Sequence, residues 1–178
     1  MPKFDLKNHI RTVPDFPEPG IMYRDITTLL SHPGALKQSV TELSNPFQDA
    51  QIDVVAGIDA RGFIFGTAVA LQLGVGFVPV RKKGKLPFDT FEQDYALEYG
   101  TDTLQIHSDA AAKRQRVLLI DDLIATGGTA EAAIKLLQRT DCDIVGAAFV
   151  IDLPDLGGAK RIEALGVPVT SLIAFSGH

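Results

Sequence analysis

The sequence has only one cysteine, Cys142, among its 178 residues. A single thiol cannot form an intrachain disulfide, and no metal-ligand cluster surrounds it in the sequence. We interpret it as a partly buried thiol without a special role. The four histidines, at His9, His32, His107 and His178, are scattered without ligand spacing, so we predict no metal site built from protein side chains.

Long apolar runs are also missing. The longest, such as Phe63–Leu73, is too short to span a bilayer and contains glycine and polar residues. The first residues, Met1–Asp5, lack the apolar core of a signal peptide. We therefore expect no membrane segment, no export and a cytoplasmic location. The 46% of hydrophobic and 22% of charged residues are ordinary for a globular protein, and the length fits one domain spanning residues 1–178.

Positive charge is scarce, since the formal net charge is −5 and there is no basic tail. Nucleic-acid binding normally needs a broad basic surface, so we expect no nucleic-acid partner. The exception is Arg81–Lys85 (RKKGK), which places four cations within five residues and suggests a small polyanionic ligand. Taken alone, such a run is more often a solvated loop, and this alternative stays open.

Strand-like and helix-like segments alternate after residue 50. Short apolar runs are typical of strands buried on both faces, and each is followed by a stretch typical of a helix. The order predicts an α/β fold with a central, mainly parallel sheet flanked by helices, in which ligands bind beyond the carboxyl ends of the strands. Strands are expected at Ile52–Ile58, Phe77–Val80, Val117–Ile120, Ile144–Ile151 and Val167–Ile173, and helices at Phe63–Leu73, Gly128–Gln138 and Leu156–Leu165.

Other segments interrupt this alternation. Three prolines exclude a regular element after the N-terminal segment, and proline favours the first position of a helix. We expect a short helix up to about Thr12, an irregular segment at Pro14–Gly20, a helix from Pro33 to about Leu43, and an antiparallel strand pair formed by Tyr95–Gly100 and Thr103–His107.

The most informative segment is Val117–Ala130, which reads VLLIDDLIATGGTA. A buried strand leads to two carboxylates, and a loop of small residues precedes the next helix. Glycines let backbone N–H groups approach a ligand, and the helix N-terminus adds partial positive charge, so the loop suits a phosphate. It is not a Walker motif, because no lysine follows the glycines.

We predict that this segment holds a ribose 5-phosphate. Adjacent acids suit vicinal hydroxyls or a hydrated Mg²⁺, and threonine hydroxyls add donors to the phosphate. The alternative is that Asp122 or Thr126 only caps the helix and the glycines form a tight turn. The predicted ribose and 5-phosphate residues are Asp121, Asp122, Ala125, Thr126, Gly127, Gly128 and Thr129.

The segment closely resembles the phosphoribosyl pyrophosphate signature of the type I phosphoribosyltransferases. Four further blocks resemble the adenine-specific members of that family, so the resemblance spans nearly the whole chain. It implies the type I phosphoribosyltransferase fold, with a flexible β hood and an N-terminal base-binding segment. The blocks are Phe16–Thr27 (FPEPGIMYRDIT), Gly57–Phe63 (GIDARGF), Arg81–Pro87 (RKKGKLP) and Leu97–Gly100 (LEYG).

The resemblance implies a purine-salvage reaction in which adenine and 5-phospho-α-D-ribose 1-diphosphate (phosphoribosyl pyrophosphate) give AMP and diphosphate. Mg²⁺ would be bound mainly through the substrate diphosphate and ribose hydroxyls. Relatives form homodimers, in which a neighbour's basic residues can complete the site, so we expect a homodimer. Two alternatives stay open: a non-catalytic regulator that senses the same ligand, and the same reaction on hypoxanthine, guanine or orotate.

The diphosphate is expected at two strand ends. Asp59, Ala60 and Arg61 follow one strand and precede a helix, where arginine can grip a diphosphate with paired donors. In the family this turn often contains a non-proline cis peptide, here at Asp59–Ala60. The alternative is a surface ion pair between Asp59 and Arg61. Arg81 and Lys85 would stabilise the charge on the leaving diphosphate.

Lys82 and Lys83 receive no assignment within the cationic run. The polar segment after it, Leu86–Asp94, is expected to form a mobile hood over the substrate.

Glu98 and Arg61 are the predicted catalytic residues. In a strand, Glu98 would share a face with Ala96 and Gly100, which leaves room for a flat heterocycle. The resemblance implies that Glu98 contacts the N7 side of the purine and shuttles a proton as N9 attacks. Because glutamate ordinarily has a pKa of about 4.3, an acid role at neutral pH would need a desolvated site. The alternative is a solvated strand carboxylate.

Met22, Tyr23 and Arg24 are the predicted adenine-binding residues. An aromatic ring can stack on a purine while loop backbone groups read its edge. The alternative is that Tyr23 anchors the core. Met and Tyr stand where we expect Val, Leu or Phe in relatives.

Overall fold

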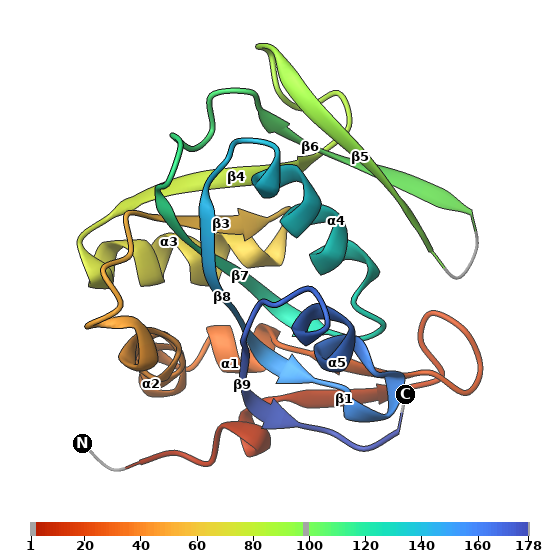
Figure 1. The fold of residues 1–178 in the computed structure, drawn as a ribbon. Coiled ribbons are helices and arrows are strands. Elements are labelled where there is room, and N and C mark those ends of the chain that lie inside the picture. The colour runs from red at the N-terminus through yellow and green to blue at the C-terminus, as the bar shows by residue number, and fades with distance from the viewer. Residues whose placement is uncertain (1–2, 98–99, 178) are drawn as a thin grey trace.

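A central β-sheet organises the computed structural model, which describes residues 3–97 and 100–177. Within these residues the sheet has seven strands in the order β5-β6-β4-β3-β7-β8-β9, and the five from β4 to β9 are mutually parallel (Figure 1). The sheet strands are β3 (Val54–Ile58), β4 (Gly76–Lys82), β5 (Thr90–Ala96), β6 (Thr101–His107), β7 (Arg116–Ile124), β8 (Asp143–Asp152) and β9 (Val169–Ala174).

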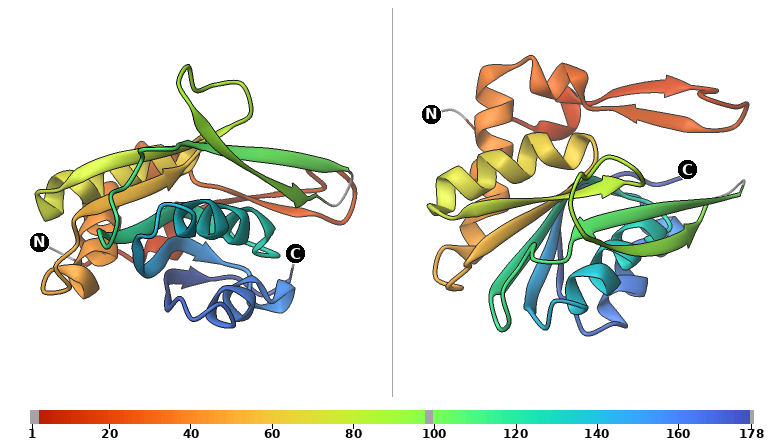
Figure 2. Two further views of the ribbon diagram at one scale, coloured as in Figure 1. Left: turned by 45° about the horizontal axis from the view of Figure 1, so that its top comes forward. Right: turned by 90° about the horizontal axis from the view of Figure 1, so that it is seen from above.

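Helices cover both faces of the sheet (Figure 2). Side chains alternate between the faces along each strand, so Val55 and Leu118 pack toward α2 and α3, whereas Ala56 and Leu119 pack toward α4 and α5. The expected α/β fold is therefore confirmed. The helices are α1 (Thr27–Leu30), α2 (Pro33–Ser44), α3 (Arg61–Leu73), α4 (Gly128–Gln138) and α5 (Gly158–Glu163), with short 3₁₀ turns at Leu6–His9, Asn45–Phe47 and Pro154–Leu156.

Two hairpins project beyond the same end of the sheet (Figure 2). One is formed by β1 (Arg11–Pro14) and β2 (Met22–Asp25), with the expected irregular segment as its loop. The other is formed by β5 and β6, and it joins the main sheet through a short antiparallel ladder in which Arg81 and Lys82 of β4 face Gln105 and Leu104 of β6. The hairpins thus flank the carboxyl ends of β3 and β7.

Several expected elements are confirmed with small shifts of their ends. The helix after His32 begins at Pro33, and α3 ends where Gly74 adopts a φ of 72°. The helix Gly128–Gln138 has the expected bounds. The predicted antiparallel pair is present, but the bounds of its first strand were wrong: β5 spans Thr90–Ala96 and shares only Tyr95 and Ala96 with the predicted strand.

Other expectations were wrong in part. The N-terminal helix stops at His9, and Arg11 instead begins a strand that pairs with β2. The helix expected over Leu156–Leu165 is divided, because Gly157 has a φ of 75° and separates the 3₁₀ turn from α5. The segment expected to form the hood, Leu86–Asp94, is part of strand β5 from Thr90 onward. Each difference depends on a pairing partner or backbone angle outside the local pattern.

The helices of the described residues include none that is both long and apolar enough to cross a membrane.

Candidate active site

A pocket of about 440 Å³ lies beyond the carboxyl ends of β3 and β7. Its wall combines three segments that sequence analysis treated separately. They are residues 58–61, residues 121–129, and a side wall formed by Lys82 at the end of β4 with Tyr95 and Leu97 at the end of β5.

The loop between β7 and α4 forms the floor of this pocket. Gly127 caps α4 with a φ of 81°, which glycine adopts without strain, and the helix begins at Gly128. The N-terminus of α4 therefore points its first amide groups toward the pocket, an arrangement suited to an anion. No side chain of the loop caps the helix, so the capping alternative for Asp122 and Thr126 is wrong.

The start of α5 supports this loop from behind. Gly158 donates its amide hydrogen to the carbonyl oxygen of Ala125 at 3.0 Å. A Cβ at Gly158 would clash with that carbonyl and lie 2.8 Å from the amide nitrogen of Gly127. Arg161 pairs with Glu131 of α4 and also donates to the carbonyl of Thr126 at 3.4 Å. Gly158 and Arg161 were not among the predicted site residues; the paired glycines after β8 were the available signal in the sequence.

The two acids lie within β7 rather than after it, because the ladder with β8 continues to Ile124. Asp122 is buried and forms an ion pair with the guanidinium of Arg61, with 2.5 Å between Nε and Oδ2. Burial lowers the pKa of Arg61, but the Asp122 carboxylate outweighs it, and the net shift is upward. The alternative of an Asp59–Arg61 ion pair is wrong, because Asp59 instead accepts from Arg81 at 3.2 Å.

Asp121 lies in a less favourable environment for a charge. Burial and the neighbouring Asp122 carboxylate raise the pKa of Asp121 well above its ordinary value. Its Oδ1 accepts the backbone N–H of Asp122 at 2.9 Å. A Cβ at Gly62 would lie 2.8 Å from this oxygen, so glycine allows α3 to approach β7 closely.

The turn at the end of β3 contains a cis peptide bond between Asp59 and Ala60, as expected. Arg81 connects this turn to the cationic run, because it bonds both Asp59 and, at 3.4 Å, the carbonyl of Lys85. The Lys85 side chain is exposed and is not among the residues that line the pocket. The unassigned Lys82 does line it, held by Asp102 and by the hydroxyl of Tyr95.

The sequence is similar to known proteins over nearly its whole length. A model of the phosphoribosyl transferase domain matches residues 25–174. The adenine phosphoribosyltransferase of Maricaulis maris is 63% identical over 173 residues, which cover 97% of this chain and 99% of the relative. The chain belongs to the adenine phosphoribosyltransferase family.

Solved adenine phosphoribosyltransferases share this fold. The enzyme from Rhodothermus marinus is 54% identical with a TM-score of 0.90, over 96% of each chain. The enzyme from Saccharomyces cerevisiae, in complex with adenine and an imino-altritol bisphosphate, is 38% identical with a TM-score of 0.88, over 95% of this chain and 97% of the other. The expected type I phosphoribosyltransferase fold is thereby confirmed.

The residues expected to bind the base in this family lie on β2. Tyr23 packs edge-on against Phe16, with 5.1 Å between ring centroids, and Arg24 lies over the ring of Phe175. Met22 is partly exposed, and none of the three lines the pocket as described. Tyr23 nevertheless lies close enough to Arg61 to interact with it electrostatically, so the hairpin lies beside that edge of the site.

Glu98, the expected proton carrier, lies outside the described residues, and its role stays a prediction. Its neighbours Tyr95 and Leu97 both line the pocket.

Proposed function

We propose that this chain, as one phosphoribosyltransferase domain spanning residues 1–178, converts adenine and phosphoribosyl pyrophosphate to AMP and diphosphate. The observation that carries the proposal is the single pocket in which the β7–α4 loop and the Asp59–Arg61 turn meet. The adenine-bound Saccharomyces cerevisiae relative supports the choice of base.

The substrate would lie across the two loops. Residues 125–129 would bind the 5-phosphate at the N-terminus of α4, and Asp121 and Asp122 would accept hydrogen bonds from the ribose hydroxyls. Arg61 would turn from Asp122 toward the diphosphate. The ion pair between Arg61 and Asp122 would thus be replaced by contacts of both side chains with the substrate.

Displacement at the anomeric carbon would then proceed through an oxocarbenium-like state. Arg61, Arg81 and Lys85 would stabilise the charge that develops on the departing diphosphate. Lys82, which lines the pocket, joins this set. Glu98 would hold the proton of the base while N9 attacks, and Met22, Tyr23 and Arg24 would form the adenine segment.

Mg²⁺ fits this site as a substrate-bound ion. Adjacent carboxylates provide the oxygen ligands that Mg²⁺ prefers, and the described residues contain no group of three acidic, histidine or cysteine side chains that would complete its coordination. Most ligands would therefore come from the diphosphate and ribose oxygens. Bound there, the ion would neutralise charge on the diphosphate.

We further propose a cytoplasmic homodimer. The lone Cys142, half-buried and hydrogen-bonded to a backbone carbonyl, needs no oxidising compartment. The cationic run Arg81–Lys85 is largely exposed, so in a homodimer the run of one chain could act at the site of the other. Light scattering at micromolar concentration tests the dimer.

Diphosphate release measured with each free base tests the function. We expect turnover with adenine and little with hypoxanthine, guanine or orotate. Turnover with another base but not adenine would contradict the specificity. No turnover with any base, together with binding of phosphoribosyl pyrophosphate, would favour a regulator.

The substitution Glu98→Gln tests the proton carrier. We expect kcat to fall by about 10²-fold or more with little change in either KM, because general acid–base catalysis typically contributes that much. Glu163→Gln, an exposed acid on α5, is the matched control. An unchanged kcat would remove Glu98 from the chemistry.

A further inference from the structure

The cationic loop leaves the sheet where the hood joins it. The ladder between β4 and β6 has two residue pairs, and Gln105 occupies one of them, opposite Arg81. On its other side Gln105 pairs with Glu92 of β5. Gln105 therefore lies at the junction between the main sheet, the hood and the loop that carries the cations.

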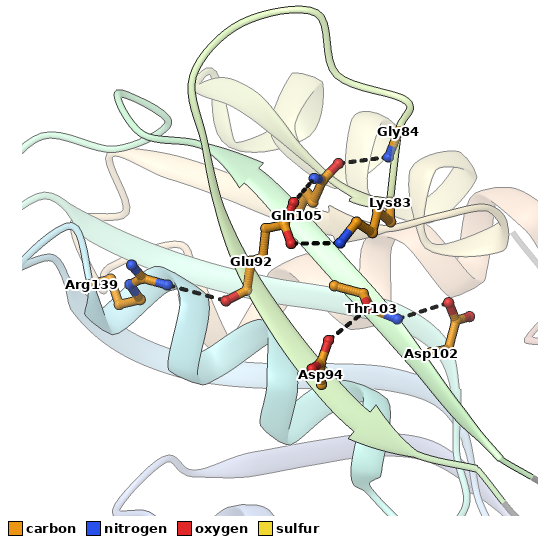
Figure 3. Close-up of polar contacts among 8 residues, drawn as sticks. All are labelled: Lys83, Gly84, Glu92, Asp94, Asp102, Thr103, Gln105 and Arg139. Atoms are coloured by element: carbon orange, nitrogen blue, oxygen red, sulfur yellow. Dashed lines mark hydrogen bonds and ion pairs between the residues drawn. The ribbon is translucent and has the colours of Figure 1, made fainter.

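The side chain of Gln105 is buried, with 6% of its surface exposed, and both ends of its carboxamide have partners (Figure 3). Its oxygen accepts the backbone N–H of Gly84 at 2.8 Å, and its nitrogen donates to Oε1 of Glu92 at 2.5 Å. The second oxygen of Glu92 accepts from the ammonium of Lys83 at 2.9 Å. These four residues form a closed ring of polar contacts around the turn.

The ring fixes the turn of the cationic loop. Gly84 has a φ of 79°, and its N–H donates to the side-chain oxygen of Gln105 where the chain turns after β4. Arg81 precedes Gly84 in the chain and contacts Asp59 in the turn at the end of β3. Lys85 follows Gly84, and its carbonyl accepts from Arg81. Holding the N–H of Gly84 therefore fixes the turn between Arg81 and Lys85, the two cations proposed to bind the diphosphate.

The same ring is connected to the phosphate loop. Arg139, at the C-terminal end of α4, donates to the carbonyl of Glu92 at 3.1 Å (Figure 3). Its guanidinium also lies over the ring of Phe91. The helix that begins at the 5-phosphate loop thus ends against the strand that supports Gln105. Strand β5 therefore contacts both the residue that holds the turn after β4 and the helix that follows the 5-phosphate loop.

We propose that Gln105 is a positioning residue for the diphosphate-binding cations, acting through Gly84 and Glu92 without touching the substrate. This inference rests on the proposed function, because it assigns a role within the same reaction.

The substitution Gln105→Glu tests it. The new carboxylate keeps an acceptor for Gly84 but loses the donor to Glu92 and places two acids against each other. Losing a buried hydrogen bond typically weakens an interaction by about tenfold, so we expect KM for phosphoribosyl pyrophosphate to rise about tenfold. KM for adenine should stay within about twofold, since the hydrogen bonds of the ring run to β5 and the turn after β4 and not to the β2 strand that carries the proposed adenine residues.

Adding Glu92→Gln to Gln105→Glu should restore most of the affinity, because the acid and the amide are then exchanged and the hydrogen bond between them returns. Gln93→Glu is the matched control, since it adds the same charge to the next position of β5, whose amide bonds only the neighbouring Asp94 carbonyl. We expect it to leave both KM values unchanged.

Three results would overturn the proposal: an unchanged KM for phosphoribosyl pyrophosphate, an equal rise in both KM values with a lower Tm, or a double variant no better than the single one. Calorimetric titration of each variant with phosphoribosyl pyrophosphate gives the same comparison without turnover. A wild type that binds this ligand but does not react with adenine would contradict the proposed function and leave the test of Gln105 intact.

Discussion

The two loops that would hold the substrate are built differently. The loop between β7 and α4 is shaped by backbone contacts, since Gly127 and Gly158 pack against each other with no room for a Cβ. The cationic loop after β4 is shaped by side chains, through the Gln105 ring and the Lys82–Asp102 pair. A backbone-packed loop has few alternative conformations, whereas a loop held by polar side chains on the surface can rearrange.

The loops also differ in how their acids respond to pH. Burial raises the pKa of Asp121 beside the phosphate loop. The hydrogen bond from Lys82 lowers the pKa of Asp102, near the turn of the β5–β6 hairpin. Ionisation therefore opposes folding at the first loop and favours it at the second.

The largest effect is expected from Gly158→Ala. The new methyl group would clash with the Ala125 carbonyl, which is backbone and cannot move aside cheaply. Overpacking of this kind costs about 1–3 kcal/mol, measured as the free energy of unfolding in denaturant, and should also raise KM for phosphoribosyl pyrophosphate. Gly76→Ala is the control, because its nearest neighbour lies at 3.9 Å. Equal stability of the two variants would mean that backbone packing does not shape the phosphate loop.

A smaller effect, of opposite sign, is expected from Asp121→Asn. The folded-state pKa is raised, so ionisation destabilises the fold above the pKa of the unfolded chain, about 3.9, and this penalty is absent below it. The amide keeps the acceptor for the Asp122 N–H. The variant should therefore have a higher Tm than wild type at pH 7, and the difference should vanish near pH 3.5.

Asp102→Asn provides the opposite comparison. Its lowered pKa stabilises the fold above the unfolded value, and this contribution is lost as pH falls. The variant should have a lower Tm at pH 7 and approach wild type in acid. Shifts of the same sign for both variants would contradict the contrast between the loops.

The smallest effect is expected from Lys83→Met. Its ion pair with Glu92 is exposed, with 62% and 42% of the two side chains accessible, and exposed pairs contribute about 0–1 kcal/mol. We expect the free energy of unfolding to change by less than about 1 kcal/mol and KM for phosphoribosyl pyrophosphate by less than about threefold. A larger loss would make Lys83, rather than Gln105, the main support of the turn.

Local patterns predicted the parts of the fold that depend on local physics. The apolar runs located the buried strands, and Pro33, Gly74 and Gly128 marked helix ends through their backbone preferences. The pairing of β1 with β2 and the extension of β7 could not be predicted, because both depend on a partner strand distant in sequence.

The candidate site divides in the same way. The segment Val117–Ala130 by itself predicted a phosphate loop, because a strand, small residues and a helix N-terminus are consecutive in the chain. Its support by Gly158, the pairing of Arg61 with Asp122 rather than Asp59, and the ring around Gln105 were decided by tertiary structure. Backbone preferences act between neighbours in sequence, whereas close packing and charge pairing act between neighbours in space.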